Sequence, residues 1–185
     1  MTAEPAIRLA QPEDLSAIVA ISNWAATHLT ANFATEPEPE AMWVASWEAT
    51  HAAYPWLVAH DGGERVLGFA KASPHRIRGA YAWTAEVSVY VASGAHRRGI
   101  GAALYARLIP ILRAQGYVAL LAGITPPNPA SEGLHTRAGF VRCGTYHRVG
   151  WKFGAWHDVG YWELHLQPDG EPPRPVRPVV EVWGP

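Results

Sequence analysis

Two adjoining stretches decide the fold: Glu86-Val87-Ser88-Val89-Tyr90-Val91 and His96-Arg97-Arg98-Gly99-Ile100-Gly101-Ala102-Ala103-Leu104-Tyr105. The first has the β-branched and aromatic residues of a strand, and the second passes from a Gly-x-Gly turn into an apolar helical pattern. Glycine lets the backbone approach a ligand closely, a helix start offers unpaired N–H groups, and two arginines add positive charge. This junction therefore predicts a binding site for a phosphate group.

The junction does not fit two familiar nucleotide-binding motifs. Leu104 stands where the dinucleotide fingerprint Gly-x-Gly-x-x-Gly requires its third glycine, and no Gly-Lys-Ser/Thr sequence follows, as a P-loop would require. By itself, the motif leaves two interpretations open, a plain tight turn and a phosphate site. The rest of the chain has to decide between them.

Composition excludes several classes of protein. The 185 residues suffice for one domain, predicted over 1–167, and the segment 168–185 carries six prolines and is expected to be an extended tail. A formal net charge of −1 gives no basic surface for nucleic acid, and no stretch approaches the roughly 18 apolar residues of a membrane span. The single cysteine, Cys143, fits a reducing, cytoplasmic setting. Despite nine histidines, no His-x-x-x-His pair with an acidic partner predicts a metal site.

Strand-like and helix-like segments alternate along the chain, which predicts one mixed sheet flanked by helices in an α/β or α+β domain. The expected strands are 7–9, 56–60, 65–70, 83–91, 118–124, 140–147 and 161–166. The expected helices are 11–28, 42–54, 100–115 and 131–138. Asp61-Gly62-Gly63 predicts a hairpin turn between the second and third strands.

A strand, a basic Gly-x-Gly turn and a helix in this order resemble the acetyl-CoA site of the GNAT N-acetyltransferases. The likeness extends over nearly the whole chain, through 32–37, 54–59, 79–91, 114–117, 154–162 and 172–179. The resemblance implies a mixed, mostly antiparallel, seven-stranded sheet that is splayed between its fourth and fifth strands and flanked by helices. It also implies acetyl transfer from acetyl-CoA to the amino group of a small amino acid analogue, such as phosphinothricin or methionine sulfoximine.

The same resemblance implies where acetyl-CoA binds. The turn would hold the pyrophosphate on its backbone N–H groups, and the splay would free backbone groups of the fourth strand, including that of Val87, for the acetyl and pantetheine parts. The implied contacts are Val89, Val91, His96, Arg97, Arg98, Gly99, Gly101, Ala102, Tyr105 and Asn128. His96 departs from the glutamine or arginine that the family has at this position. Asn128 is also compatible with an ordinary turn residue, and Tyr105 with a tyrosine at the edge of the core.

Acetylation requires a neutral amine, whereas an α-ammonium group loses its proton only near about pH 8 or above. Glu86 matches the family's catalytic glutamate, which implies that it removes this proton directly or through water. His135 matches a family histidine near the active site and is a second candidate catalytic residue, although a lone histidine on a short helix is as often structural. No partner that would activate Cys143 is evident, so direct transfer is expected.

Arg76 and Arg78 are predicted to share one face of a β-like stretch, where two guanidinium groups suit a carboxylate or phosphinate. Two solvated arginines in a hairpin are the competing interpretation. Phe33, Thr35 and Trp83 are expected to line the acceptor pocket. Lys71 stands where the family usually has an aromatic residue, so the pocket is expected to differ in detail.

Three other functions remain open at this level. The acceptor could be another amine, namely an ordinary amino acid, a polyamine or a protein amino terminus, because similar scaffolds host many acceptors. The chain could bind acyl-CoA without turnover. It could also bind a protein partner through its nine tryptophans, although these residues more often fill cores and subunit contacts. A homodimer is expected from the resemblance and from the tryptophan count.

Overall fold

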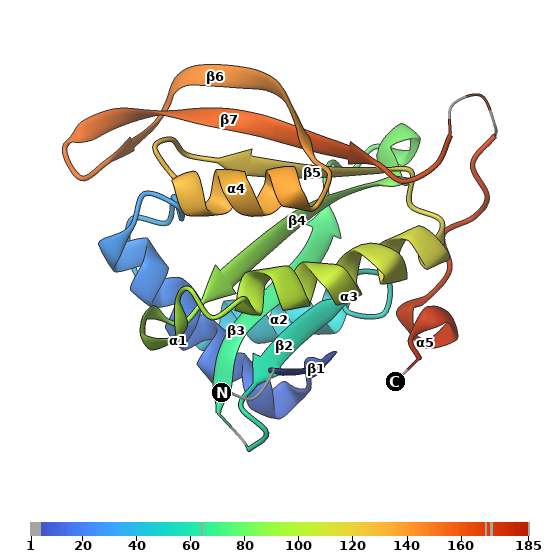
Figure 1. Cartoon of the computed structure of the whole chain (residues 1–185), viewed down its shortest axis with the longest axis horizontal. Helices are drawn as coiled ribbons and strands as arrows, with labels where there is room; N and C mark the ends of the chain where they lie inside the picture. Colours follow the sequence, from blue (N-terminus) through green and yellow to red (C-terminus); the bar gives the residue numbers. More distant parts are fainter. Residues whose placement is uncertain (1–4, 64, 169, 171, 185) are drawn as a thin grey trace.

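The computed structural model describes residues 5–63, 65–168, 170 and 172–184. In chain order the elements are β1 (Ala6–Leu9), the 3-10 turn η1 (Pro12–Asp14), α1 (Leu15–His28), α2 (Glu40–Thr50), β2 (Trp56–His60), β3 (Val66–Pro74), η2 (Gly79–Tyr81), β4 (Thr84–Val91), η3 (Ser93–Ala95), α3 (Ile100–Gln115), β5 (Ala119–Ile124), α4 (Pro129–Arg137), β6 (Val141–Lys152), β7 (Ala155–His165) and α5 (Val179–Val182) (Figure 1). Within these residues, no helix is both long and apolar enough to cross a membrane.

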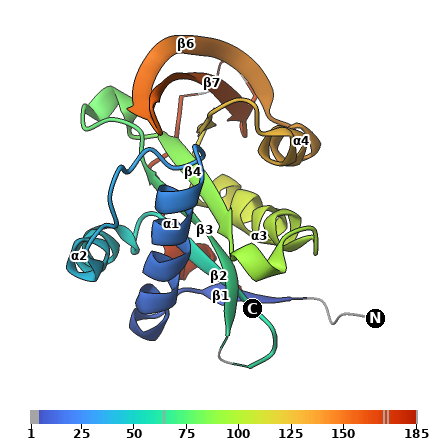
Figure 2. The same cartoon turned by 90° about the vertical axis from the view of Figure 1, so that its left-hand side faces the viewer.

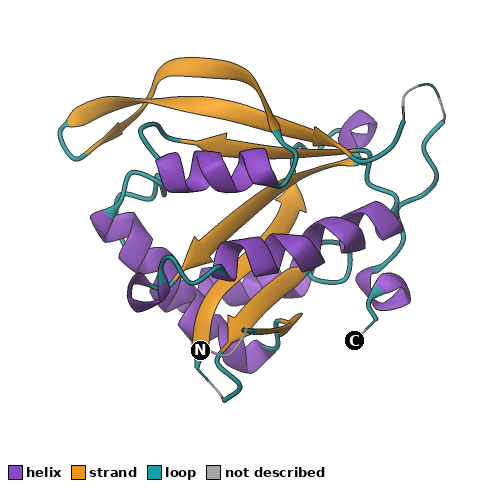
Figure 3. Ribbon diagram, in the orientation of Figure 1, coloured by secondary structure: helices purple, strands orange, loops and turns teal. Residues whose placement is uncertain are grey.

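The strands form a single mixed sheet in the order β1-β2-β3-β4-β5-β7-β6. Helices α1 and α2 lie on one face of it and α3 on the other (Figures 2 and 3). Only the β4–β5 pair is parallel, because α3 carries the chain over the sheet between these two strands. The predicted fold class, the antiparallel majority and the β2–β3 hairpin are confirmed.

β4 and β5 pair only at their first residues and then diverge. The paired positions are Thr84 to Glu86 on β4 and Ala119 to Leu121 on β5. Beyond Glu86, β4 continues to Val91 along β3, whereas β5 continues to Ile124 along β7. The predicted splay is therefore confirmed, and it begins directly after Glu86.

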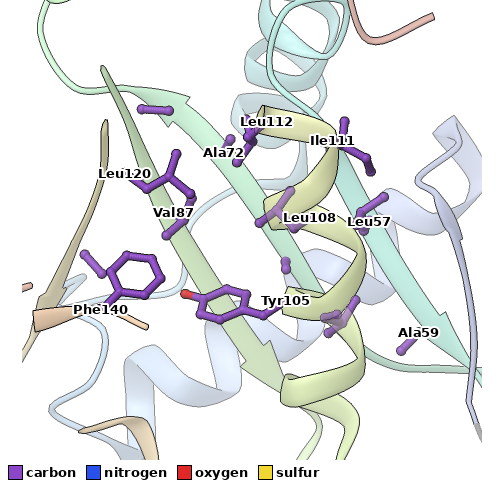
Figure 4. Close-up of a cluster of buried hydrophobic side chains, with 14 of the residues drawn as sticks. Leu57, Ala59, Ala72, Val87, Tyr105, Leu108, Ile111, Leu112, Leu120 and Phe140 are labelled. Carbon is purple, nitrogen blue, oxygen red and sulfur yellow. The ribbon is translucent and has the colours of Figure 1, made fainter. Parts of the chain in front are cut away.

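Two apolar clusters, one on each face, hold the sheet between the helices. On the α3 face, Tyr105, Leu108 and Leu112 pack against the sheet and share one buried cluster with Val87 and Phe140 (Figure 4). On the α1–α2 face, the buried cluster contains Trp43, Trp56 and Phe69 beside residues of α1. All but the last residue of β2 are buried, as expected for a strand covered on both faces.

The β6–β7 hairpin is longer than the sequence pattern predicts. The predicted strands were 140–147 and 161–166, whereas β6 runs to Lys152 and β7 begins at Ala155. Irregular pairing between Tyr146 and Gly150 breaks the two-residue alternation that marks a strand, so the extension was missed. Phe153 and Gly154, with φ of 50° and 74°, form the tight turn between the two strands.

Smaller differences concern the ends of helices and the tail. The first predicted helix is divided into η1 and α1, and α2 ends at Thr50 rather than 54 because Tyr54 turns to pack against Tyr117. Residues 172–178 have no regular secondary structure, and 179–182 form a helical turn that buries Val179, which the prediction of an extended tail did not include. Residues 169, 171 and 185 of the predicted tail lie outside the described residues.

The carboxyl-terminal segment is attached to three parts of the domain. The Trp83 indole donates to the carbonyl of Arg174 at 2.7 Å, and the N–H of Val179 donates to the carbonyl of Ala52 at 2.8 Å. Gln115, which is fully buried, donates its side-chain amide to the carbonyls of Ala53 and Arg177, both at 2.8 Å. This segment therefore packs as part of the domain.

A half-buried ion pair joins β1 to the start of α1. Arg8 donates to both carboxylate oxygens of Asp14, at 2.5 and 2.8 Å, and the N–H of Gln11 donates to the same carboxylate at 2.8 Å. Burial alone would raise the pKa of Asp14, but these hydrogen bonds and the charge of Arg8 outweigh it and hold the pKa below its usual value. The carboxylate thus stabilises the fold above the pKa of the unfolded chain, and this contribution is lost as the pH falls through the lower folded-state pKa.

Asp14→Asn is expected to lower the free energy of unfolding by about 2 kcal/mol at pH 7, because it leaves the guanidinium of Arg8 without its counter-ion. The difference from wild type should begin to shrink below about pH 4, where the Asp14 carboxylate of the unfolded chain takes up its proton, and it should go on shrinking down to the lower folded-state pKa. Urea unfolding at pH 7 and pH 3.5 measures both values. Glu13→Gln, at an exposed neighbouring acid, should change the free energy of unfolding by less than about 0.5 kcal/mol, and an equal loss there would contradict this role of Asp14.

Candidate active site

The loop between β4 and α3 is shaped by two left-handed residues. Arg97 has a φ of 60° and Gly99 a φ of 76°, and Gly99 is the N-cap of α3. The first hydrogen bond of the helix runs from the N–H of Ala103 to the carbonyl of Gly99, so the N–H groups of residues 100–102 have no acceptor within the helix. Residues 96–99 and 102 are exposed. The loop and helix start thus present donors and positive charge to solvent, a combination that suits an anion.

Gly101 lets this helix start lie close to α4. A Cβ at Gly101 would approach Leu134 Cδ2 to 3.1 Å and Val89 Cγ2 to 3.8 Å. The helix start therefore lies next to Val89, in the part of β4 that has separated from β5. The backbone edge of β4 that β5 no longer covers, with Val89 and Val91, thus runs beside the anion-binding loop.

Glu86 lies where β4 and β5 begin to separate, and it is held by an unexpected neighbour. Its Oε1 is 2.7 Å from Nδ1 of His75, and Nε of Arg76 donates to Nε2 of the same imidazole at 3.3 Å. The Glu86 side chain is 46% exposed and that of His75 only 16%, so a ligand can reach the carboxylate while the imidazole lies behind it. An exposed carboxylate with one oxygen already engaged can take a proton on the other.

The prediction that Arg76 and Arg78 lie on one face of a β-like stretch is wrong. β3 ends at Pro74, so Arg76 and Arg78 lie in the loop before η2 and not on a strand. The proline ends the ladder because it has no N–H to donate. Both arginines nevertheless line one open hollow of about 480 Å³ with Ile77 and Tyr81, which adjoins His75 and Glu86 through Arg76.

The loop between α1 and α2, which carries Phe33 and Thr35, is attached to the sheet. Lys152 on β6 is 4% exposed and donates to the carbonyls of Leu29, at 3.0 Å, and Asn32. Phe33 and Thr35 are both exposed, and the ring of Phe33 lies so close to Gly150 that a Cβ at this glycine would clash with it. The loop is thereby fixed beside β6, on the side of the molecule where the β6–β7 hairpin lies over the separating strands β4 and β5 (Figure 1).

Lys71 and Trp83 have neighbours that the sequence did not suggest. The ammonium of Lys71 lies 4.7 and 4.4 Å from the ring centroids of Trp43 and Trp56, and burial lowers its pKa although Glu38 opposes the shift. Register places Lys71 opposite Ser88, on the same face of the sheet as Glu86. The Trp83 indole binds the carboxyl-terminal segment, as described above. The roles of Phe33, Thr35 and Trp83 toward an acceptor stay predictions.

Tyr105 and His135 form a separate, buried pair between α3 and α4. His135 Nδ1 donates to the carbonyl of Ser131 at 2.8 Å, so Nε2 accepts from the hydroxyl of Tyr105 at 2.9 Å. Burial lowers the pKa of His135 and raises that of Tyr105, so both groups stay neutral. Tyr105 packs with Val87 on the α3 face, whereas Glu86 points to the other face of β4. The structure therefore does not join His135 to the Glu86 network by a hydrogen bond.

Two further predicted cofactor contacts have local partners. The side-chain oxygen of Asn128 accepts from the N–H of Ser131 at 3.1 Å and caps α4, which leaves its NH2 group available. His96 Nε2 lies 3.1 Å from the carbonyl of Val91, which folds the imidazole back toward β4. The sequence missed His75 and Lys152, since their contacts cross between elements. Knowledge of the β3–β4 register, which pairs Ser73 with Glu86, would have drawn attention to His75.

The geometry agrees with what comparison to known proteins finds. Residues 18–140 match the model of the acetyltransferase (GNAT) family. This chain belongs to the GNAT acetyltransferases. The acetyltransferase activity and the fold that the sequence predicts are thus confirmed, with the helix-start loop and the splayed strands in the places that the resemblance implies.

Several GNAT relatives are similar over most of their length. The chain is 41% identical over 176 residues to a phosphinothricin N-acetyltransferase of Streptomyces viridochromogenes, covering 95% of each chain. It is 40% identical to an L-methionine sulfoximine/L-methionine sulfone acetyltransferase of Pseudomonas aeruginosa, covering 90% of this chain and 98% of the relative. A crystal structure of a GNAT phosphinothricin acetyltransferase from Sinorhizobium meliloti with acetyl-CoA has a TM-score of 0.83, with 32% identity and 89% coverage of both chains.

Proposed function

We propose that this GNAT enzyme transfers the acetyl group of acetyl-CoA directly to the amino group of phosphinothricin, methionine sulfoximine or a similar small amino acid analogue. The names of its relatives support this acceptor class. The observation that carries the proposal is the placement of an accessible carboxylate, Glu86, at the point where β4 leaves β5. A reactive thioester bound along the free edge of β4 would lie next to this carboxylate.

Acetyl-CoA is the first substrate, and the residues around the start of α3 fit its chemistry. The pyrophosphate would accept hydrogen bonds from the N–H groups of the loop and first turn, with Arg97 and Arg98 supplying charge. The amides of pantetheine would pair with the uncovered edge of β4 at Val89 and Val91, as a strand pairs with a neighbour. Asn128 and the His96 imidazole lie at the margin of this site.

In the transfer step, Glu86 takes a proton from the acceptor ammonium, directly or through one water. The freed nitrogen lone pair attacks the thioester carbon, and the carbonyl π electrons move to oxygen. An N–H of β4 beyond Glu86 can donate to this oxyanion because β5 does not occupy it. The intermediate then collapses, the C–S bond breaks, and its electron pair leaves with the sulfur of CoA, which takes up a proton, while the nitrogen loses its second proton.

A covalent acetyl-enzyme is not needed for this reaction. Partial burial and the charge of Glu163 raise the pKa of Cys143, which leaves less of the thiolate that an acyl carrier requires. The homodimer and the reducing, cytoplasmic compartment remain part of the same proposal. The exposed indoles of Trp151 and Trp156, whose centroids lie 5.4 Å apart on the β6–β7 hairpin, support a subunit contact there.

The acceptor assignment is tested by following release of the CoA thiol with phosphinothricin, methionine sulfoximine, the common amino acids and spermidine as acceptors. We expect the first two to have the highest kcat/KM. In Arg78→Gln, the KM for these anionic acceptors should rise about tenfold, because one guanidinium of the hollow is lost. Arg142→Gln, which changes an arginine on β6 that is bonded to Thr145, is the matched control.

Turnover with spermidine alone, or a lower KM for a cationic acceptor in Arg78→Gln, would contradict the proposed acceptor class. The acetyltransferase activity would still stand. Tight binding of acetyl-CoA without turnover on any acceptor would contradict the activity itself. Acetylation of a herbicide-like molecule can also be a side activity of an enzyme whose usual substrate is another amine. A higher kcat/KM for a common amino acid than for phosphinothricin and methionine sulfoximine would indicate such a side activity.

A further inference from the structure

We propose that His75 is a positioning residue for Glu86, whose carboxylate it orients while Arg76 fixes the tautomer of the imidazole. This inference rests on the proposed role of Glu86 as the base. His75 directly follows Pro74, the last residue of β3, and Pro74 pairs with Ala85 across the ladder. The end of β3 therefore places the imidazole of His75 next to the Glu86 side chain.

The tautomer follows from the partner on the far side of the ring. Arg76 donates its Nε hydrogen to His75 Nε2 at 3.3 Å, and a guanidinium has no acceptor. Nε2 must therefore carry the lone pair, which places the ring hydrogen on Nδ1. Nδ1 then donates to Glu86 Oε1 across 2.7 Å. The three side chains form one directed chain of hydrogen bonds that ends on the carboxylate.

An aromatic side chain holds this chain of hydrogen bonds in place. The ring of Tyr81 meets that of His75 edge to face at 5.4 Å, and the guanidinium of Arg76 lies 5.8 Å from the Tyr81 centroid. Because the His75 side chain is 16% exposed, its rotamer is restricted, whereas the 46% exposed Glu86 keeps Oε2 open to a ligand. The imidazole therefore acts through Glu86 and does not meet the acceptor itself.

Titratable and charged groups face the pair from three elements. Arg76 and Tyr81 face it from the loop and η2, and Tyr161 faces it from β7, where burial and then the charge of Glu86 raise its pKa while Arg76 lowers it. The hydrogen bond from His75 thus fixes the orientation in which the Glu86 carboxylate meets the acceptor.

The test compares two substitutions that differ in one donor. His75→Phe keeps a ring against Tyr81 but has no hydrogen to donate, whereas His75→Asn has an amide NH2 near the place of Nδ1. In His75→Phe, kcat is expected to fall about tenfold with the KM for acetyl-CoA unchanged, because the carboxylate loses the partner that orients it. His75→Asn should recover most of this loss.

Two outcomes would overturn the proposal. One is a wild-type kcat in His75→Phe, and the other is an equal loss of kcat in His75→Asn and His75→Phe, which indicates packing alone. In the Glu86→Gln background, His75→Phe should cause no further loss of rate, because the residue acts only through the carboxylate. Thermal unfolding of each variant checks that it is folded.

A second readout needs no acetyl transfer, so it separates this inference from the proposed function. Nitrogen-15 NMR of the histidine rings in the wild-type protein should show His75 with its hydrogen on Nδ1, and Arg76→Gln should allow exchange with the other tautomer. A hydrogen on Nε2 in the wild type would overturn the inference even if the enzyme is active. An inactive wild-type enzyme with the expected tautomer would instead contradict the proposed function.

Discussion

Glu86→Gln is expected to reduce kcat at pH 7 by at least about a hundredfold, because an amide cannot take the proton of the acceptor ammonium. The amide oxygen can still accept the hydrogen of His75 Nδ1, so the side chain should keep its place. Release of the CoA thiol measures the rate, and calorimetric titration should give an unchanged affinity for acetyl-CoA. The deficit should narrow above about pH 9, where more of the acceptor amine is neutral without help from the enzyme.

The matched control for this variant is Glu48→Gln, which removes an exposed carboxylate on α2 and should leave the rate within about twofold of wild type. If Glu86→Gln retained more than a tenth of the wild-type rate at neutral pH, another group would have to be the base. His135 would be the next candidate, and its substitution together with that of Tyr105 would then be required.

Ala102→Glu is expected to weaken acetyl-CoA binding by about tenfold to a hundredfold, because it places a negative charge beside the site proposed for the pyrophosphate. The residue is exposed in the first turn of α3, where a carboxylate favours the helix, so the thermal midpoint should stay the same or rise. Loss of binding without loss of stability is a result that misfolding cannot produce. Calorimetry with acetyl-CoA and thermal unfolding provide the two measurements.

Ala106→Glu provides the control, since Ala106 is exposed one turn further along the same helix. It adds the same charge to the protein but lies away from the free N–H groups, and its affinity for acetyl-CoA should stay within about threefold of wild type. Equal weakening in both variants would mean that net charge, and not the helix start, governs binding. Unchanged affinity in Ala102→Glu would contradict the proposed pyrophosphate site.

The parts of the fold that sequence predicts well are those whose signals are local. The strand, the Gly99 turn and α3 are adjacent in the chain, and each follows from residues within it. The extension of β6 was missed because the irregular pairing near Arg148, which has a φ of 51°, hides the alternation of the strand. The splay was available only through the resemblance, since no local pattern states that two strands separate.

The residues of the candidate site likewise divide into those that a local sequence pattern predicts and those that only tertiary contacts bring together. Glu86 and the helix-start loop follow from a continuous stretch, whereas His75 reaches Glu86 only through the register of β3 with β4. Lys152 binds the loop after α1 from more than a hundred residues away in the chain. Contacts of this kind depend on tertiary packing, so a single sequence does not reveal them.

The attachment of the carboxyl-terminal segment has a consequence for synthesis on the ribosome. At the end of α3, the side-chain amide of Gln115 donates to the carbonyl of Arg177, and the N–H of Arg177 donates to the carbonyl of Gln115. The N–H of Val179 donates to the carbonyl of Ala52, in the turn after α2. While the chain is still emerging, the sheet can assemble and the Gln115 amide can bind Ala53, but the carbonyl of Gln115 lacks the N–H of Arg177 until that residue has emerged. Nascent chains that stall before residues 174–179 have emerged should therefore expose this end of the helix to chaperones and proteases, and the arrival of these residues should cover it.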